Sequence, residues 1–559
     1  MENQLRVIRN ILGLVLKLTM LPYLLAYLSE SLPMLQSTPQ TRIFSIILII
    51  FGVTGMFISD LLLLRFGDGR AHLSLKATRL VNVGFYARTR HPFQWFFSLY
   101  FSGVITMYLG FTWNSLLSTL AMTILFLLTL SIVQEGFLLK AFGKRYETYR
   151  NDTPAWYWKW SIPDNLKVGF RPQLVWVFGM LVLKPWYKIK VHGTENIPYE
   201  RPFLIVANHE CYLDPFLFGV FVPFEIKFVT TADVFTTPLM RFLMKGTGGF
   251  PMRRHRQDLK AIRTMIRMVN SGQVVCIFPE GGRSIDGSPL PILKETLKLI
   301  QRCKVPILPL HLDGAYEIWP RWAANRRRGQ VSATFNPIIE VKDQSDLSVL
   351  EAQISSRIFA PKKIFRPVNS SAITQGLDNL LWACYKCNTR NSIQVRSGRS
   401  IQCNHCDTIW DVSSDYTITD RELSKELNSI DWLSDITDTV LEHPLHLHIE
   451  FDELHNEIFH LDSGVTRYVS DDGATLVQGL RLILSDKRML LLQDEHLLHA
   501  WPLEGITIFT MDYFNAVSIG VGGIRHSFTL PQHEITLKWQ IYFDTLKYEC
   551  TQALHNSDK

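Results

Sequence analysis

Long apolar runs near the start of the chain constrain its fold most, because about 20 apolar residues in a helix span a bilayer. Three runs are long and apolar enough to span a bilayer: Ile43–Leu64, Phe93–Gly110 and Leu116–Val133. A fourth run, Ile8–Leu28, contains Lys17 and Pro22, so we expect a transmembrane helix that is tilted or lies partly in the interface. Residues 1–160 are therefore predicted to form an α-helical polytopic membrane domain.

Basic residues predict how these spans are oriented, because cytoplasmic loops carry an excess of Lys and Arg. Two loops on one side carry them: Arg65, Arg70, Lys76, Arg79, Arg88, Arg90, and then Lys140, Lys144, Arg145 and Arg150. The loops on the other side contain almost none. With four spans, both chain ends and everything after residue 140 face the cytoplasm. The first apolar run has no small-residue cleavage site, so we expect no signal peptide.

The charge and the cysteines indicate partners and compartment. The formal net charge is +7, and the excess lies near the apolar segments, which favours an anionic membrane surface over nucleic acid. Four of the eight cysteines form two C-x-x-C pairs, a pattern typical of reduced thiolates around a metal. We expect a multi-pass protein of a bacterial cytoplasmic membrane, with its catalytic domains on the cytoplasmic face.

In residues 165–360, short β-branched runs alternate with helical periods, a pattern that is typical of an α/β domain with a parallel sheet. Three short runs read as buried strands: Phe203–Ala207, Val274–Phe278 and Ile307–Leu310. Apolar residues from Leu259 to Val269 recur at helical spacing, and Gly272 is placed to end that helix. Gln173–Tyr187 is apolar, aromatic and short, which predicts an interfacial helix that holds the domain on the membrane.

Asn208 to Asp214 form a candidate catalytic turn where a buried strand ends, the usual place of ligands in an α/β sheet. Asp214 followed by Pro215 is typical of the cap and first turn of a helix, so His209 and Asp214 share the turn before it. Such a turn can bring the carboxylate onto one imidazole nitrogen and leave the other to take a proton. Asp214 could also be a cap only, and a single histidine near a strand end is usually structural.

Three further blocks follow this turn in order: Gly248-Gly249-Phe250-Pro251-Met252-Arg253-Arg254, then Phe278-Pro279-Glu280-Gly281-Gly282-Arg283-Ser284, then Val305–Leu310. Over about residues 165 to 345 the set resembles the glycerolipid acyltransferases typified by lysophosphatidic acid acyltransferases. The family blocks correspond to these residues: N-H-x-x-x-x-D to Asn208, His209 and Asp214, F-x-x-R to Phe250 and Arg253, and F-P-E-G-T-R-S to Phe278–Ser284. Gly282 replaces the family's Thr, and Met252 replaces an acidic residue.

The resemblance implies transfer of an acyl group from a thioester to an alcohol. His209 would accept the alcohol's proton while Asp214 holds its tautomer. Arg253 and Arg283 would hold the acceptor's phosphate through forked hydrogen bonds, and Glu280 would orient its glycerol portion. The other expected substrate-binding residues are Asn208, Phe250, Gly281 and Pro306. A basic patch resting on anionic lipid is the alternative for Arg253, Arg254 and Arg256.

The membrane region contains a second motif set, Gly84-Phe85-Tyr86-Ala87-Arg88-Thr89-Arg90-His91-Pro92 before one span and Glu135 to Tyr149 after the next. Over about residues 50 to 160 this resembles isoprenylcysteine and phospholipid methyltransferases of membranes. The resemblance implies that Arg90, His91 and Glu135 bind S-adenosylmethionine. Gln134 and Gln94 depart from the family pattern. Positive-inside anchoring by Arg88 and Arg90 is the alternative explanation.

The two C-x-x-C pairs, Cys384 with Cys387 and Cys403 with Cys406, are separated by fifteen residues. That spacing suits one tetrahedral zinc ion on two knuckles, and four sulfurs leave no position for His405 or a substrate. Ser397-Gly398 is a candidate hairpin turn between them. We therefore expect a structural zinc ribbon over residues 380–415, which we interpret as a folding element and not a catalytic one.

A last domain is expected over residues 440–559, after a Pro- and Ser-containing linker and an acidic stretch. Gly479–Gln493 and Ala500–Phe509 look like strands, and Ile535–Leu546 looks like a closing helix. The pattern resembles pleckstrin-homology or GRAM-like domains in these strands, in Trp501, and in Lys538-Trp539 of the helix. A plain packing module is the alternative to a lipid or protein contact.

Together these features predict a multidomain membrane-bound acyltransferase that moves a fatty acyl group from acyl-CoA or acyl carrier protein to a lysophospholipid. Two other functions stay open. One is a bifunctional or mainly S-adenosylmethionine-dependent lipid methyltransferase. The other is a non-catalytic lipid-binding scaffold, which the presence of His209, Asp214, Glu280 and Arg283 disfavours.

Overall fold

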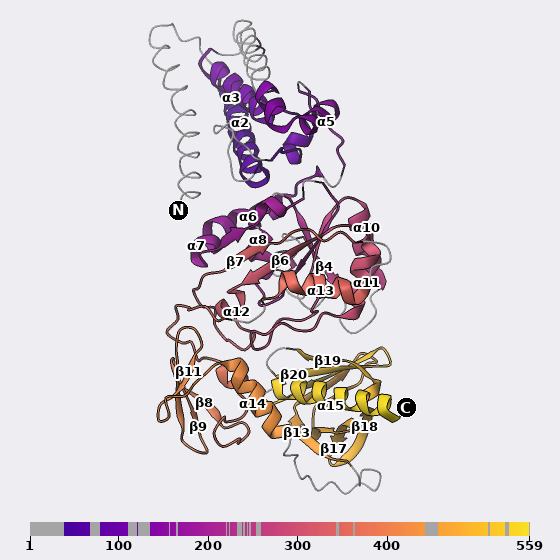
Figure 1. Cartoon of the computed structure of the whole chain (residues 1–559). Coiled ribbons are helices and arrows are strands. Elements are labelled where there is room, and N and C mark those ends of the chain that lie inside the picture. The colour runs from indigo at the N-terminus through magenta and orange to yellow at the C-terminus, as the bar shows by residue number, and fades with distance from the viewer. Residues whose placement is uncertain are drawn as a thin grey trace. The chain divides into compact units, whose positions relative to one another are not determined.

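A computed structural model describes most of the chain, and its elements are shown in Figure 1. The described residues are 38–67, 79–109, 120, 124, 135–155, 157–163, 166–198, 200–219, 221–222, 224–231, 238, 241–242, 244, 248–252, 259–341, 346–360, 364–441, 457–512, 515–531 and 536–557. Contacts divide the chain into two compact units, each described by itself below: Met1–Trp176 with Gly219–Ile226, and Val177–Phe218 with Lys227–Lys559.

The first unit is built on two packed helices, α2 (Pro39–Phe66) and α3 (Pro92–Leu109). They approach closely because glycines face the partner: a Cβ on Gly52 would lie 2.5 Å from the Tyr100 backbone nitrogen. On other faces of α2, apolar side chains such as Ile47 and Phe51 are exposed. Of the described residues, α2 alone is long and apolar enough to cross a membrane, with mean hydropathy 2.4.

The helix expected at Ile43–Leu64 is thus confirmed, and α3 covers the helix expected at Phe93–Gly110 with 18 residues. The run Ile8–Leu28, and Leu116–Val133 except for helical positions 120 and 124, lie outside the described residues. Four spans and their orientation therefore stay a prediction. Shorter helical pieces complete the unit: η2 (Gly84–Ala87), residues 135–142 and α5 (Lys144–Asp152).

A helical segment lies where the interfacial helix is predicted. It comprises α6 (Phe170–Phe178), a π-helical turn η4 (Gly179–Leu183) and α7 (Lys184–Trp186). Phe178, Leu181 and Trp186 on it are exposed. The helix is confirmed, and its place in a membrane interface stays a prediction.

The second unit contains a seven-stranded sheet in the order β1-β7-β6-β2-β5-β3-β4. Its strands are β1 (Lys190–His192), β2 (Leu204–Ala207), β3 (Ile226–Thr231), β4 (Gly249–Met252), β5 (Val274–Ile277), β6 (Ile307–Asp313) and β7 (Ser332–Phe335). The three predicted strands are confirmed as β2, β5 and β6. The predicted parallel pairing is confirmed for β2 with β5 and β6, whereas β7 runs antiparallel to β6. Such a reversed strand is common toward the edge of parallel sheets.

Helices cover this sheet and bury its apolar strands. They are α8 (Asp214–Gly219), α10 (Leu259–Asn270), α11 (Lys294–Cys303), α12 (Ala315–Ile318) and α13 (Leu347–Ile358). Met265 of α10, Ile300 of α11 and Ile354 of α13 pack in one cluster with Val206 and Val275 of the central strands. These helices therefore cover one face of the sheet. As predicted, α10 ends before Gly272, which has a positive φ of 79°.

A five-stranded antiparallel sheet carries the cysteine motifs, in the order β12-β11-β10-β9-β8. Its strands are β8 (Ile393–Ser397), β9 (Ser400–Cys403), β10 (Ile409–Val412), β11 (Ile418–Asp420) and β12 (Glu426–Leu427), and α14 (Ser429–Leu441) follows. The hairpin expected at Ser397-Gly398 is confirmed, since Ser397 pairs with Ser400.

The C-terminal part is β-rich, with a four-stranded sheet β13-β16-β17-β18 and a five-stranded sheet β15-β14-β21-β20-β19. The first contains β13 (Phe459–Val465), β16 (Leu480–Ser485), β17 (Arg488–Gln493) and β18 (His496–Pro502). The second contains β14 (Arg467–Ser470), β15 (Thr475–Leu476), β19 (Ile506–Asp512), β20 (Ala516–Val521) and β21 (Ile524–Thr529). Helix α15 (Thr536–Ser557) closes the domain as predicted.

Two expected strands are wrong as single elements. Gly479–Gln493 is a hairpin of β16 and β17, because the Ser485 hydroxyl accepts the N–H groups of Lys487 and Arg488 and turns the chain there. Ala500–Phe509 contains the end of β18, a short 3₁₀ turn η9 (Leu503–Gly505) and the start of β19. A continuous apolar run cannot reveal such a turn, since both strands of the hairpin are buried.

Candidate active site

The turn after β2 brings the predicted catalytic pair together. His209 Nδ1 lies 2.7 Å from Asp214 Oδ2, and Asp214 is the first residue of α8. The Asp214 side chain is fully buried, whereas 18% of the His209 side chain is exposed. The Asp214 carboxyl group therefore contacts the imidazole and is shielded from water. The predicted turn geometry is therefore present.

The Asp214 carboxylate is held by its own turn. Oδ2 also accepts the backbone N–H groups of Glu210 at 2.7 Å and Cys211 at 3.0 Å, and Oδ1 accepts the Cys211 thiol at 3.2 Å. Because Oδ2 is an acceptor, Nδ1 of His209 carries the proton and Nε2 is the basic nitrogen of the ring. Burial raises the pKa of the Cys211 thiol well above its usual range, so this cysteine remains a donor and not a nucleophile.

Glu280 connects the two loops of the site. Its Oε1 accepts the His209 backbone N–H at 2.7 Å, and its Oε2 accepts the Leu290 backbone N–H at 2.8 Å. Burial raises the pKa of Glu280 to about 8, although these two N–H groups act to lower it. Both oxygens accept backbone N–H groups, so Glu280 positions the two loops, and its expected contact with the acceptor's glycerol stays a prediction.

Asn208 is also engaged by the backbone. Its amide nitrogen donates to Leu312 O at 2.9 Å, and its amide oxygen accepts Leu312 N at 2.7 Å. The side chain thereby continues the pairing between β2 and β6 after β2 has ended. This fixes the start of the candidate catalytic turn against the sheet, and the expected contact of Asn208 with substrate stays a prediction.

The Phe278–Ser284 loop lies directly against His209. The Phe278 ring stacks on the His209 ring with centroids 4.2 Å apart, and Ser284 N donates to His209 O at 2.9 Å. Gly281 has φ of +66°, and a Cβ there would lie 2.5 Å from Leu293 Cδ1, so the loop requires glycine. The Arg283 guanidinium lies 3.4 Å from the centre of the Tyr212 ring.

Two of the remaining expected substrate-binding residues, Pro306 and Phe250, lie among the described residues. Pro306 precedes β6 and accepts Leu204 N at 2.9 Å. Since β2 and β6 are parallel, Pro306 lies at the opposite edge of the sheet from His209, and its expected contact with substrate stays a prediction. Phe250 is a buried residue of β4. Arg253, like Arg254 and Arg256, lies outside the described residues.

Sequence reasoning missed the residues that hold the turn from outside it. The buried Glu210 carboxylate accepts Tyr316 N at 2.9 Å, and Tyr316 is fully buried. No motif spacing signals this contact across more than 100 positions. Phe278 could have been found, because it opens the F-P-E-G block that was already assigned to the site.

Arg90, His91 and Glu135 meet in the first unit. Glu135 Oε1 lies 2.9 Å from an Arg90 guanidinium nitrogen and 3.4 Å from His91 Nε2. The hydrogen bond from His91 and the charge of Arg90 lower the pKa of Glu135, against a desolvation that raises it. Among the described residues, the buried Arg90 Nε and the Tyr146 hydroxyl have no hydrogen-bond partner. The cluster thus retains polar atoms that a polar ligand could satisfy.

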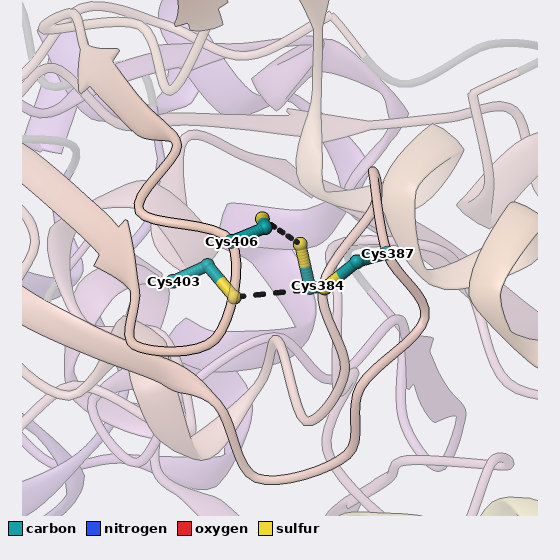
Figure 2. Close-up of side chains that lie close together, drawn as sticks. All are labelled: Cys384, Cys387, Cys403 and Cys406. Atoms are coloured by element: carbon teal, nitrogen blue, oxygen red, sulfur yellow. Dashed lines mark hydrogen bonds between the residues drawn. The ribbon is translucent and has the colours of Figure 1, made fainter.

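Four cysteine side chains converge on one point (Figure 2). Their sulfur atoms lie within 4.8 Å of one another, and Cys384 to Cys406 and Cys387 to Cys403 are each 3.7 Å apart. A disulfide needs about 2.05 Å, so these distances do not describe one. A tetrahedral zinc with bonds of about 2.3 Å to sulfur needs sulfur atoms about 3.8 Å apart. The residues present therefore fit a zinc ion.

The two knuckles have the same local geometry. Lys386 N donates to Cys384 Sγ and His405 N to Cys403 Sγ, both at 3.3 Å. The hydroxyl of Thr389 lies 3.2 Å from Cys387 Sγ, and that of Thr408 lies 3.3 Å from Cys406 Sγ. The two backbone N–H donors, Lys386 N and His405 N, favour thiolates, the form in which cysteine binds a metal.

Comparisons with known proteins agree with the geometry of the second unit. A family model described as Acyltransferase matches residues 188–313. A second model, described as a protein of unknown function (DUF1295), matches residues 2–153, and its description names no activity for the membrane region. The methyltransferase resemblance of that region therefore has no independent support.

The relatives are acyltransferases by name. Over 160 residues the chain is 28% identical to a chloroplastic 1-acyl-sn-glycerol-3-phosphate acyltransferase of Brassica napus, covering 28% of this chain and 46% of that protein. Over 127 residues it is 28% identical to the Bacillus subtilis enzyme of the same name, covering 22% and 63%. The crystal structure of the 1-acyl-sn-glycerophosphate acyltransferase PlsC from Thermotoga maritima matches at 24% identity over 42% of this chain and 91% of that one, with a TM-score of 0.30.

The chain thus spans about half the length of the first curated relative that it matches. The matched residues contain the His209–Asp214 turn, the Phe278–Ser284 loop and β6, which together make up the site described above. Residues 188–313 thus match the Acyltransferase family model, and this part of the chain is similar to 1-acyl-sn-glycerol-3-phosphate acyltransferases.

Proposed function

We propose that this chain is a membrane-bound acyltransferase that moves a fatty acyl group from acyl-CoA or acyl carrier protein to a lysophospholipid of the lysophosphatidic acid type. One observation carries the proposal: Asp214 holds His209 Nδ1 at 2.7 Å in the turn after β2. That contact makes Nε2 the proton acceptor and stabilises the imidazolium that forms. The names of the relatives support the choice of acceptor.

The reaction then follows from this geometry. His209 Nε2 takes the proton of the acceptor's hydroxyl as its oxygen attacks the thioester carbonyl. The carbon–sulfur bond breaks, an ester forms, and the imidazolium returns the proton to the leaving thiolate. No enzyme nucleophile is needed, which agrees with the buried, protonated Cys211 thiol.

Arg283 is the described residue best suited to the acceptor's phosphate. It follows the Glu280-Gly281-Gly282 turn, and its guanidinium carbon lies 3.4 Å from the centre of the Tyr212 ring, a contact that restricts the side chain. A side chain restricted in this way loses less entropy when it binds a phosphate. Arg253 is the second proposed phosphate ligand, on the strength of its motif alone.

The test is release of free thiol from an acyl thioester in the presence of a lysophospholipid. We expect His209→Ala to lower kcat by a factor on the order of 10² to 10⁴, since it removes general base catalysis. The matched control is His192→Ala, an exposed histidine on β1, three positions from β2 in the sheet order. Near-normal turnover in His209→Ala would overturn the mechanism. A wild-type chain that releases no thiol would favour the lipid-binding scaffold.

We also propose that Cys384, Cys387, Cys403 and Cys406 hold a structural zinc. The sulfur separations of 3.7 Å support it. A closed set of four thiolates leaves no coordination position for substrate, so the ion would stabilise the fold of the ribbon.

A second candidate function is methyl transfer from S-adenosylmethionine by the membrane domain. It is favoured by the cluster of Arg90, His91 and Glu135, in which the buried Arg90 Nε and Tyr146 hydroxyl have no partner among the described residues. The cofactor, when bound, supplies an electrophilic methyl group. Arg90 and His91 would hold its carboxylate, and Glu135 would accept from its amino group.

A further inference from the structure

Tyr316 of α12 contacts both loops of the candidate acyltransferase site. Its backbone N–H donates to the Glu210 carboxylate at 2.9 Å, beside His209. Its hydroxyl donates to Ile285 O at 3.2 Å, directly after Arg283 and Ser284. The ring is fully buried, so both contacts are shielded from water. One residue thus holds the histidine loop and the Phe278–Ser284 loop at a fixed separation.

The same tyrosine is held from the side of the cysteine ribbon. Trp322 Nε1 donates to the Tyr316 hydroxyl at 2.8 Å, and the Trp322 ring meets the Tyr416 ring edge-on at 6.0 Å. Phe365 lies 5.9 Å from the Tyr316 ring and 5.8 Å from the Tyr416 ring. The Tyr416 hydroxyl donates to Glu317 O at 2.7 Å, one residue after Tyr316.

Tyr416 belongs to the cysteine-bearing sheet. It lies between β10 and β11, and β10 pairs with β9, whose last residue is the metal-ligand candidate Cys403. The Tyr416 backbone has φ of +62° and donates to Ser413 O at 3.1 Å, so a tight turn directs its side chain. The position of this side chain therefore depends on the fold of the cysteine-bearing sheet.

The tip of the β8–β9 hairpin makes a second attachment. Ile373 N donates to Gly398 O at 2.9 Å, and Ile373 O accepts an Arg327 guanidinium N–H at 2.7 Å. That guanidinium lies 4.8 Å from the centre of the Trp322 ring and 5.4 Å from that of Tyr416. Burial lowers the pKa of Arg327, which is the expected cost of placing its charge in this core. The cysteine-bearing sheet thus contacts the residues around Tyr316 in two places, through Tyr416 and through the tip of the β8–β9 hairpin.

We infer that the metal ribbon positions the acyltransferase site, with Tyr416 and Tyr316 as positioning residues that fix the loops of His209 and Arg283. The inference rests on the proposed acyltransferase function only for its kinetic consequence. Loss of the metal frees the β9–β10 turn, Tyr416 then no longer fixes the chain at Glu317, and both loops gain freedom. A base that is less well placed lowers kcat more than it changes substrate binding.

The first measurement is hydrogen exchange by mass spectrometry on the full chain in detergent. We expect Tyr416→Phe, which removes only one buried hydroxyl, to speed amide exchange about tenfold in residues 209–213 and 280–290. Metal-depleted wild-type protein should show the same change in the same segments, and residues 480–493 of the C-terminal sheet should not change in Tyr416→Phe. This readout needs no catalysis, so it decides the inference even if no acyl transfer is found.

The second measurement is the kcat and KM of thiol release. We expect Tyr416→Phe and Tyr316→Phe each to lower kcat about three- to tenfold with KM for the acceptor within about twofold, and the double variant to be less than additive. Tyr385→Phe is the control, since its hydroxyl accepts an exposed bond from Lys425 Nζ at 2.7 Å. Unchanged exchange in both loops, in Tyr416→Phe and in metal-depleted protein, would overturn the inference.

Discussion

The backbone N–H of His209 donates to the carboxylate of Glu280 at 2.7 Å, which links the proposed general base to the loop of the proposed phosphate ligand. The second oxygen of Glu280 accepts the Leu290 backbone N–H at 2.8 Å. The two motifs that define the site are thus joined by one buried carboxyl. Its chemistry offers the most direct tests of how the site is held.

Glu280→Gln should disturb the site although it conserves shape. An amide has one acceptor oxygen, so one of the two backbone N–H groups would face an NH₂ group and remain unsatisfied. Such a buried donor costs about 1–3 kcal/mol in stability. We expect a lower midpoint of thermal unfolding and thiol release reduced roughly ten- to hundredfold. Glu340→Gln, at an exposed position of the same unit, is the control. Wild-type values in Glu280→Gln would show that the two contacts are unimportant.

Stability should depend on pH through Glu280. Its carboxyl ionises at an ordinary value near 4.5 in the unfolded chain, whereas burial raises the pKa to about 8 in the folded protein. Between these values the folded state keeps a proton that the unfolded state has lost, so the free energy of unfolding falls as the pH rises. We expect the unfolding midpoint to decline from about pH 5 to about pH 8, more steeply in wild type than in Glu280→Gln. Equal slopes in the two proteins would contradict this assignment.

Purified, reduced protein should contain one zinc per chain. Cys384→Ser combined with Cys387→Ser should abolish metal binding and destabilise the ribbon, because a structural site contributes its binding energy to folding. Metal analysis together with thermal unfolding measures both effects. Cys303→Ser is the matched control, since Cys303 ends α11 outside the cluster. An absence of zinc in freshly purified protein would remove the site.

The membrane domain should bind S-adenosylmethionine in a saturable way if the second candidate function is correct. Glu135→Ala and His91→Ala should each abolish that binding, because they remove two partners in one cluster. Titration calorimetry measures it, and Glu147→Ala, at an exposed position of α5, is the control.

Each outcome of that titration has a meaning. Binding that survives both substitutions would reject the assigned residues. Wild-type protein without saturable binding would show that the cluster no longer functions as a cofactor site. Binding lost in both variants, with methyl transfer to a lipid amine or a thiol carboxylate, would make the protein bifunctional.

The sequence by itself determined the elements whose signal is local. Hydrophobic runs predicted α2, β2, β5 and β6, because burial requires apolar side chains at fixed periods. Pro215 after Asp214 predicted the turn that brings the carboxylate to His209, and the C-x-x-C spacing predicted the converging thiols. In each case the interacting residues lie within one turn or share a known ligand geometry.

Only the tertiary structure decided what depends on pairing between distant segments. Three features are of this kind: the reversal of β7, the position of Pro306 at the opposite edge of the sheet, and the split of Gly479–Gln493 into two strands. The hydrogen bonds that cause them produce no periodic pattern in the sequence. The positioning contacts of Glu280 and Asn208 arise in the same way, since folding brings distant backbone groups to their side chains. The contact of Tyr316 with Glu210 joins residues 106 positions apart, and folding alone brings them together.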